Sequence, residues 1–247
     1  MSKEWYFNFM KEISVIIPIL NESENIKLLI PEIFKNIKFL KILKYEIILV
    51  DDNSEDSIKS VVKKLKKNNK VLKLIIRKKK NRDLSKSCIL GFNNAKYKNI
   101  LVMDGDFQHH PKYIKNLVRK FSKFNNDIVI GARNLTSTKE TKLSIFRLGS
   151  SLIISSLLNL FLGKKTSDPL SGFFLFKKEI YEKNKKNLFS KGYKILADLL
   201  YCSKKNLLID EVKIKFDNRK KGESKINIKI LIILISFILN KFKSRFI

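Results

Sequence analysis

The sequence is poor in the residues that mark several classes of protein. Among its 247 residues there are only 2 Cys, 4 Pro, 8 Gly and 2 His. Cys88 and Cys202 stand far apart, without the CxxC spacing of a metal site, and this usage is typical of a reducing compartment. No Gly/Ser-rich or Pro-rich linker and no internal repeat divides the chain, which indicates one main domain.

Long apolar runs are missing too. The stretch MSKEWYFNFMKEI at the start has too short an apolar run and too many charges for a signal peptide, so we expect the chain to stay in the cytoplasm. No segment reaches the roughly 20 apolar residues that span a bilayer. The two nearest are Leu152–Leu162 and Ile226–Leu239.

Acidic residues are scarce beside basic ones. The chain has 52 Lys plus Arg against 23 Asp plus Glu, a net charge of +29, while its hydrophobic content of 44% is that of a globular protein. Such a surface attracts polyanions, which include nucleic acids, anionic lipid headgroups and phosphorylated substrates. The excess of Lys, Ile, Asn and Phe is equally typical of compositional drift, so single arginines carry more information than single lysines.

Short β-branched runs alternate with helical patterns in the first half. Strands are expected at 13–17, 45–50, 71–76, 99–103 and 127–131. Helices are expected after Asn21 or Ser23 as the cap and at 57–67, 84–95 and 111–121. This alternation predicts an α/β fold with a mainly parallel sheet flanked by helices. After Arg133 the pattern becomes helical and irregular, with further strands near 173–176 and 207–216.

Polar clusters follow four of these strands. They read PILNE, DDNS, DGDFQ and GARN, after the first, second, fourth and fifth strands respectively. Open α/β sheets bind ligands beyond the carboxyl ends of their strands, so the four clusters predict one site at that edge.

The most specific cluster is MDGDFQHHP at 103–111. Asp104 and Asp106 flank a glycine, and Gln108 adds a neutral oxygen, which together suit a hard divalent cation. The alternative is an acidic turn that caps the helix opening at Pro111. Adjacent His109 and His110 with no further His or Cys partner argue against zinc and favour residues at a helix entry, with His109 behind the metal ligands.

Taken together, these motifs resemble the family 2 glycosyltransferases, and within them the dolichyl-phosphate mannose synthase type of polyprenyl-phosphate glycosyltransferase. The resemblance covers about Ile13 to Lys225. It departs from the family pattern at His110, Gly105 and Asp198, where proline, alanine and glutamate are common. The segments that carry it are ISVIIPILNESENI, EIILVDDNSEDS, NRDLSKSCILGF, LVMDGDFQHHP, DIVIGARN, SDPLSGFFLFKK, GYKIL and RKKGESK.

The resemblance implies a GT-A type fold and assigns roles to residues. Asp104, Asp106 and Gln108 would hold Mg²⁺ or Mn²⁺ on the diphosphate of a nucleotide-sugar donor. Arg133 and Arg147 would hold the acceptor phosphate. Arg219, with Ser224 and Lys225, would belong to a loop that closes over the donor. The nucleotide-sugar pocket would be lined by Pro18, Asn21, Glu22, Asp51 and Asp52, together with Asp104.

The implied reaction is an inverting transfer of a sugar, mannose from GDP-mannose, to a polyprenyl phosphate such as dolichyl or undecaprenyl phosphate. A phosphate acceptor is already ionised at neutral pH, so positioning and charge neutralisation matter more than base catalysis. The catalytic set would be Asp104, Asp106, Arg133, Arg147 and Arg219. The alternatives are a family 2 transferase that uses UDP-glucose or a UDP-N-acetylhexosamine and, more remotely, a basic nucleic-acid-binding protein, which the carboxylates at the strand ends argue against.

A lipid acceptor requires contact with a membrane surface. We therefore expect a glycosyltransferase domain at 12–225 and a membrane-associating helix at 226–247, whose Lys241, Lys243 and Arg245 would meet anionic lipid. Ser151, Ser155 and Asn159 recur at four-residue spacing, which suggests a second interfacial helix, or alternatively an ordinary core helix, over 147–162. The enzyme would be peripheral on the cytoplasmic face, either alone or with a small membrane-anchor subunit.

Overall fold

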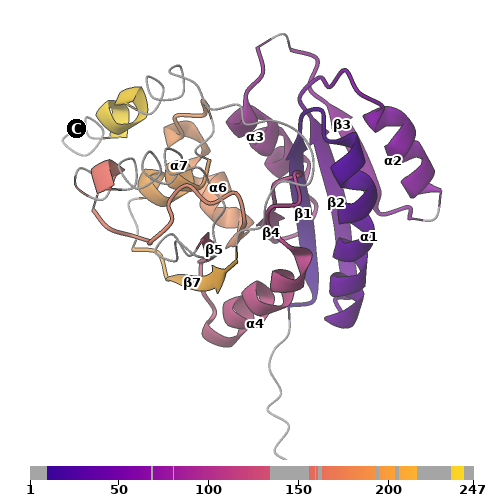
Figure 1. Cartoon of the computed structure of the whole chain (residues 1–247). Helices are drawn as coiled ribbons and strands as arrows, with labels where there is room; N and C mark the ends of the chain where they lie inside the picture. Colours follow the sequence, from indigo (N-terminus) through magenta and orange to yellow (C-terminus); the bar gives the residue numbers. More distant parts are fainter. Residues whose placement is uncertain are drawn as a thin grey trace, which may run out of the picture.

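A seven-stranded sheet forms the centre of the molecule. The computed structural model describes residues 10–67, 69–79, 81–133, 156–158, 160, 163–192, 195–203, 206–215 and 235–241. The strand order across the sheet is β3-β2-β1-β4-β6-β5-β7 (Figure 1). The strands are β1 (Glu12–Ile19), β2 (Lys44–Asp51), β3 (Leu72–Ile76), β4 (Asn99–Val102), β5 (Ile128–Arg133), β6 (Phe174–Lys177) and β7 (Ile209–Ile214).

Most neighbouring strands run parallel. β1 pairs in parallel with β2 and β4, β2 with β3, and β5 with β7. Only β6 runs against its neighbours β4 and β5 within the described sheet. The mainly parallel sheet predicted from the alternating pattern is therefore confirmed, as are the two late strands near 173–176 and 207–216.

Helices cover both faces of this sheet (Figure 1). Residues of α1, α2 and α4 pack in one apolar cluster, and residues of α3, α6 and α7 pack in the other. The bounds are α1 (Ser23–Phe39), α2 (Ile58–Lys66), α3 (Leu84–Asn94), η1 (Pro111–Tyr113), α4 (Ile114–Phe124), α6 (Lys178–Asn184), η2 (Lys185–Asn187) and α7 (Ile195–Cys202).

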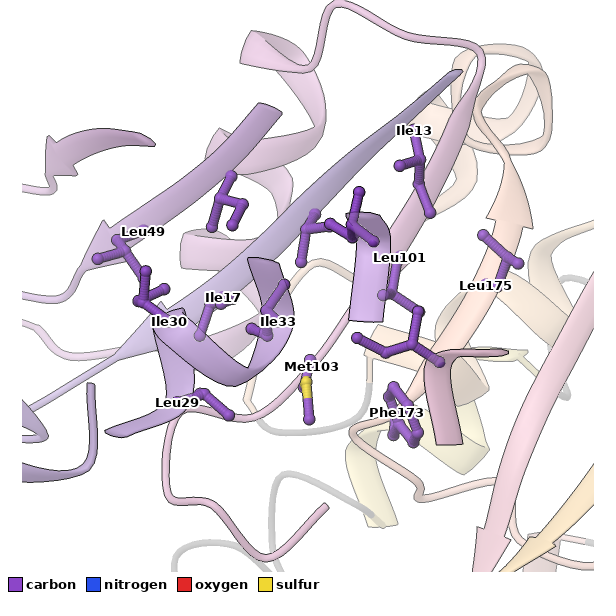
Figure 2. Packing of buried hydrophobic residues seen from close by; sticks show 14 of the residues in the cluster. Ile13, Ile17, Leu29, Ile30, Ile33, Leu49, Leu101, Met103, Phe173 and Leu175 are labelled. Atoms are coloured by element: carbon purple, nitrogen blue, oxygen red, sulfur yellow. The ribbon is translucent and has the colours of Figure 1, made fainter. Parts of the chain in front are cut away.

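Successive side chains of the central strands enter opposite layers of the core. Ile17 of β1 lies in the layer under α1, with Leu29, Ile30 and Ile33, whereas Ile16 lies in the layer under α3. Figure 2 shows the first of these layers. Because both faces are covered, a central strand has to be apolar at consecutive positions, which explains the uninterrupted runs ISVII and YEIILV.

The predicted cap of the first helix was wrong. Asn21 and Ser23 were expected as caps of α1, but the capping position is Glu22, whose side chain makes no capping hydrogen bond. Asn21 instead has a left-handed backbone with φ 55° and joins two loops, as described below. By contrast, His110 does stand at a helix entry, because its Nδ1 accepts the N–H of Lys112 at 3.1 Å.

The described parts of the two apolar segments pack on each other and on α7. Leu158 from the first segment, and Phe237 and Ile238 from the second, form a small core with Ala197. Leu160 and Leu239 are exposed, by 77% and 61%. Ser151, Ser155 and Asn159 lie outside the described residues, as do 226–234. In the part of the chain that the structure describes, no helix combines the length and apolarity needed to cross a membrane.

Lys241 was expected to meet anionic lipid, but it is buried. Its side chain is 2% exposed, and its Nζ lies 2.7 Å from Oδ1 of Asp198 on α7 and donates to the carbonyl of Asn187 at 2.7 Å. The same carboxylate accepts the backbone N–H groups of Phe189 and Ser190. The helical residues 235–241 are therefore bound to α7 by a buried ion pair.

The substitution Lys241→Met should lower the free energy of unfolding by about 3–5 kcal/mol, because it leaves a buried carboxylate without its cation. Chemical denaturation measures this change. Lys183→Met, which removes an exposed lysine paired with Glu179, should leave the free energy of unfolding nearly unchanged, because solvent screens an exposed ion pair. Equal effects of the two substitutions would contradict the importance of the buried pair.

Candidate active site at the carboxyl edge of the sheet

The loops that follow β1 and β2 are joined to each other. Asn21 donates its backbone N–H to Oγ of Ser54 at 2.8 Å, and its Oδ1 accepts the N–H of Glu55 at 2.9 Å. The N–H of Asp52 reaches the carbonyl of Ile19 at 2.9 Å. PILNE and DDNS, the first two predicted clusters, therefore meet at one edge. Ser54, which could equally have been a helix cap, serves to join the loops.

Pro18 and Glu22, two further residues of the first cluster, lie beside this junction. Pro18 is buried in β1 opposite Val50 of β2. Glu22 is half-buried and accepts a hydrogen bond from the side-chain amide of Asn25 at 2.6 Å. Both border the loop where a ligand at this edge would lie.

Asp51 is a buried acceptor at the end of β2. The residue is 1% exposed, and its Oδ1 accepts the N–H of Ser54 at 3.0 Å. Among the described residues, no donor reaches its buried Oδ2. Because buried carboxylate oxygens normally have partners, this atom suits a donor on a ligand.

The neighbouring Asp52 is already bound on both oxygens. Its Oδ1 accepts Nε of Arg77 at 2.6 Å, and its Oδ2 accepts the backbone N–H of Asp83 at 2.6 Å. Arg77 lies just beyond β3 and is 8% exposed. Asp52 therefore fixes the loop between β3 and α3, and its contact with a nucleoside stays a prediction. The sequence analysis missed Arg77, although a scarce arginine directly after the third strand was a usable signal.

The turn after β4 carries two carboxylates and an amide, those of Asp104, Asp106 and Gln108. Asp104 follows Met103, whose N–H bonds to the carbonyl of Ile16 in β1 at 3.1 Å. The side chain of Asp104 is 32% exposed, whereas Asp106 and Gln108 are 6% and 7% exposed. The N–H of Gln108 bonds to Oδ1 of Asp106 at 3.1 Å.

The backbone of this turn is unusual for its residues. Phe107 has φ 63°, in the left-handed region that a bulky residue rarely occupies. At Gly105 a Cβ would lie 2.7 Å from Cγ2 of Ile19, so the alanine common in the family would collide with β1 here. Backbone strain of this kind is concentrated at functional sites.

The donor set fits a hard divalent cation. Asp104, Asp106 and Gln108 offer oxygen ligands, which Mg²⁺ and Mn²⁺ prefer. Within the described ranges, no three His, Cys, Asp or Glu side chains are grouped so as to enclose a metal on their own. A cation held here would therefore need further ligands, and phosphate oxygens of a substrate are the usual ones.

The side chain of His109 is buried beneath the turn of Asp104 and Asp106. The ring is 2% exposed, its Nδ1 is 3.6 Å from Oδ2 of Asp104, and it packs against the ring of Phe173 at 5.6 Å. Burial lowers the pKa of His109 to about 4, with a smaller lowering from Arg133 that the nearby Asp106 opposes. The imidazole is therefore neutral at physiological pH and adds no positive charge next to the carboxylates.

Arg133, at the end of β5, is held by a residue that the sequence analysis did not single out. Its Nε and Nη2 donate to the two carboxylate oxygens of Asp168, each at 2.7 Å. The backbone N–H of Arg133 donates to the same carboxylate at 3.1 Å. Burial alone would lower the pKa of Arg133, but the Asp168 carboxylate outweighs it and raises that pKa, so the guanidinium stays charged. Asp168 belongs to the motif SDPLSGFF, which was recognised without a role for this residue.

Gly172, from the same motif, makes room for Asp104. A Cβ at position 172 would lie 2.0 Å from Oδ2 of Asp104. The two residues also line a small pocket with Leu84, Cys88 and Ile195. The loop before β6 thus shapes the site from the side opposite β1. Arg147, Arg219, Ser224 and Lys225 lie outside the described residues.

Comparison with known proteins gives consistent matches. The sequence profile described as Glycosyl transferase family 2 matches residues 14–184. A dolichol-phosphate mannosyltransferase of Pyrococcus furiosus is 34% identical over 89% of this chain, and the chain spans 60% of the length of that relative. The dolichol-phosphate mannosyltransferase of Saccharomyces cerevisiae is 32% identical over 90% of this chain and 83% of its own length.

Solved structures match over most of the chain. Glucosyl-3-phosphoglycerate synthase from Mycobacterium tuberculosis, in complex with phosphoglyceric acid, superposes with a TM-score of 0.66 and 18% identity over 95% of this chain and 80% of its own. A complex of the same enzyme with Mn²⁺, UDP and glucosyl-3-phosphoglycerate gives a TM-score of 0.64. At this identity the match shows the fold, which is the GT-A type expected from the sequence.

The substitution Gly172→Ala should weaken Mn²⁺ binding by about 10-fold or more, because the added methyl group must displace the Asp104 carboxylate. Titration with Mn²⁺ followed by electron paramagnetic resonance measures the affinity. Gly91→Ala, whose Cβ would meet Ile16 at 2.4 Å in the core, is the matched control. It should lower thermal stability but leave the Mn²⁺ affinity of the folded protein unchanged. A wild-type affinity in Gly172→Ala would contradict the placement of Asp104.

Proposed function

Because the chain belongs to glycosyltransferase family 2, we propose that it transfers a sugar from a nucleotide-sugar donor to a polyprenyl phosphate, with mannose from GDP-mannose as the leading pair. The observation that carries this proposal is the similarity to dolichol-phosphate mannosyltransferases over 89% or more of the chain. The sequence motifs that resemble this family include the residues at the ends of β1 and β2, whose loops meet at one edge of the sheet.

The carboxyl edge would hold the donor. Oδ2 of Asp51, buried without a donor among the described residues, suits an N–H of the base. Pro18, Asn21, Glu22 and Asp52 would complete the pocket around the base and ribose. Arg219, Ser224 and Lys225 would close over the diphosphate from a loop outside the described residues.

Asp104, Asp106 and Gln108 would bind the divalent cation, either Mg²⁺ or Mn²⁺. The mycobacterial enzyme of the same fold was solved with Mn²⁺ and UDP, which supports a divalent cation as the cofactor. When bound, the ion would supply a Lewis acid that stabilises negative charge on the departing nucleoside diphosphate. The packing of Asp104 over Gly172 holds its carboxylate in place, so little reorganisation is needed when the donor arrives.

The acceptor phosphate would lie at Arg133, with Arg147 as a second contact. A phosphate monoester carries at least one negative charge at neutral pH, so no general base has to remove a proton from it. Arg133 contributes a charge of fixed position, because Asp168 holds its guanidinium on two N–H groups. Positioning and charge neutralisation are then the main sources of catalysis.

We place the enzyme on the cytoplasmic face of a membrane as a peripheral protein. Exposed Leu160, Ile235 and Leu239 lie beside the small core of Leu158, Phe237 and Ile238. Exposed apolar side chains on a protein with a strong excess of positive charge are typical of contact with an anionic bilayer. A small membrane-anchor subunit would strengthen this contact.

A UDP-sugar donor is the second candidate. The mycobacterial enzyme of the same fold was solved with UDP-glucose and phosphoglyceric acid. Both guanine and uracil present an N–H that the Oδ2 of Asp51 could bind, so this atom does not separate the two bases.

The purified protein should form a lipid-linked sugar from GDP-mannose and a polyprenyl phosphate when Mn²⁺ or Mg²⁺ is present. Parallel assays with UDP-glucose and UDP-N-acetylglucosamine, with and without the lipid, identify the donor by extraction of radiolabelled product into organic solvent. If only a UDP-sugar, and not GDP-mannose, gives lipid-linked product, the donor is the UDP-sugar of the second candidate. The absence of lipid-linked product from every donor would overturn the proposed function.

Asp104→Asn and Asp106→Asn should each reduce metal-dependent transfer by about 100-fold or more, because each removes a charged ligand while preserving shape. Initial rates over a range of Mn²⁺ concentrations measure the loss, and circular dichroism checks the fold. Glu182→Gln, an exposed glutamate paired with Lys178 on α6, is the control and should retain full activity. Full activity in either aspartate variant would remove that residue from the metal site.

A further inference from the structure

The loop that carries Asp168 contains an unusual number of buried polar side chains. Thr166, Asp168 and Ser171 are 3%, 0% and 3% exposed. Ser171 ties the far end of this loop to β5, because its Oγ donates to the carbonyl of Gly131 at 2.8 Å. Buried polar groups are costly unless they are bonded, so the contacts of this loop indicate a defined position.

The near end of the loop is bound by Glu211 of β7. Oε1 of Glu211 accepts the hydroxyl of Thr166 and the backbone N–H of Ser167, each at 2.5 Å. Its Oε2 accepts the hydroxyl of Ser167. Three donors from two consecutive residues therefore converge on one carboxylate.

Thr166 connects Glu211 to Asp168. A hydroxyl has one proton to donate, and that proton goes to Glu211. The oxygen of the same hydroxyl accepts the backbone N–H of Asp168 at 3.2 Å. The carboxylate on β7 therefore sets the orientation of the Thr166 hydroxyl, and that hydroxyl helps to fix the backbone of Asp168.

Asp168 in turn fixes Arg133, through two side-chain hydrogen bonds and one from the backbone. Glu211 lies on the strand next to β5, opposite Ile130, while Arg133 ends β5 three residues later. Hydrogen bonds therefore connect Glu211 of β7 to Arg133 at the end of β5 by way of Thr166 and Asp168.

We propose that Glu211 is a positioning residue for the acceptor phosphate, which acts through Thr166 and Asp168 to set the guanidinium of Arg133. The inference rests on the proposed function and adds a residue to it. Glu211 touches neither donor nor acceptor in this assignment. Its effect should therefore be on how well the acceptor is bound and oriented.

Loss of Glu211 should displace the loop rather than unfold the protein. Glu211 is half-buried, so water can replace part of its bonding. The bond of Ser171 to Gly131 continues to hold the other end. A displacement of Arg133 by about 1 Å is enough to cost up to about 100-fold in rate through misplaced contacts.

Steady-state kinetics with donor and acceptor varied separately test this on the full-length protein. Glu211→Ala should raise the KM for polyprenyl phosphate about 10-fold or more and leave the KM for the nucleotide sugar unchanged. Thr166→Val, which keeps the shape but removes the hydroxyl, should have the same effect. Thr166→Ser, which restores the hydroxyl, should return the acceptor KM to near the wild-type value. The double variant Glu211→Ala/Thr166→Val should be no worse than either single one, because both break the same connection.

The matched control is Glu182→Ala, which removes an exposed carboxylate on α6. Glu182 pairs with Lys178 at 3.2 Å, away from Glu211, Thr166 and Asp168, so the acceptor KM of this variant should stay at the wild-type value. An unchanged acceptor KM in Glu211→Ala, an equal rise in the donor KM, or no rescue by Thr166→Ser would overturn the inference while wild-type transfer still supports the proposed function. A wild-type protein that makes no lipid-linked product would overturn the proposed function and this inference with it.

Discussion

The burial of the central strands on both faces is the constraint from which the site follows. Ile16 and Ile17 of β1 are both fully buried, in opposite layers, and β2 repeats this with Ile48 and Leu49. Charged side chains therefore have no place along most of these strands and collect where the strands end. The buried Glu46, near the start of β2, has bonds from Ser14, Lys73 and the N–H of Lys96. At the opposite end of the strands, Oδ2 of the buried Asp51 has no donor among the described residues, and the side chain of Asp104 is 32% exposed.

Residues other than glycine adopt the left-handed backbone conformations in the loops at that edge. The chain has only 8 Gly, and the loops use left-handed Asn21, Asn53 and Phe107 instead. Asparagine tolerates this conformation because its short side chain can bond to nearby backbone, as Asn21 does with Glu55. Phe107 has no such compensation from its own side chain, and its burial under the turn holds the conformation. The turn of Asp104 and Asp106 is therefore stabilised by packing, which favours fixed ligand positions.

Much of this arrangement could be predicted, because it depends on local pattern. Runs of consecutive apolar residues predicted the strands. Polar residues after these runs predicted the edge of the sheet at which Asn21 bonds to Ser54. The cap of α1 was wrong because a polar residue before a helix can serve either the helix or a neighbouring loop, and sequence alone does not distinguish these. The pairs of Arg77 with Asp52 and of Arg133 with Asp168 join residues 25 and 35 apart, with no periodic signal. Lys241 was hidden for another reason: among 52 basic residues, nothing in the sequence marks the one that is buried against Asp198.

The pairing of Arg133 with Asp168 separates two tasks that a phosphate site must perform. A guanidinium whose charge is largely balanced by a carboxylate attracts a distant phosphate weakly, but it holds its N–H groups in a fixed direction. The net charge of +29 supplies long-range attraction, which salt screens over about 10 Å. Under the proposed function, the lysine-rich surface would gather anionic lipid and acceptor near the protein, and Arg133 would orient one phosphate. The lysine excess can then be compositional in origin and still be useful, because attraction at long range depends on the number of charges and little on their exact positions.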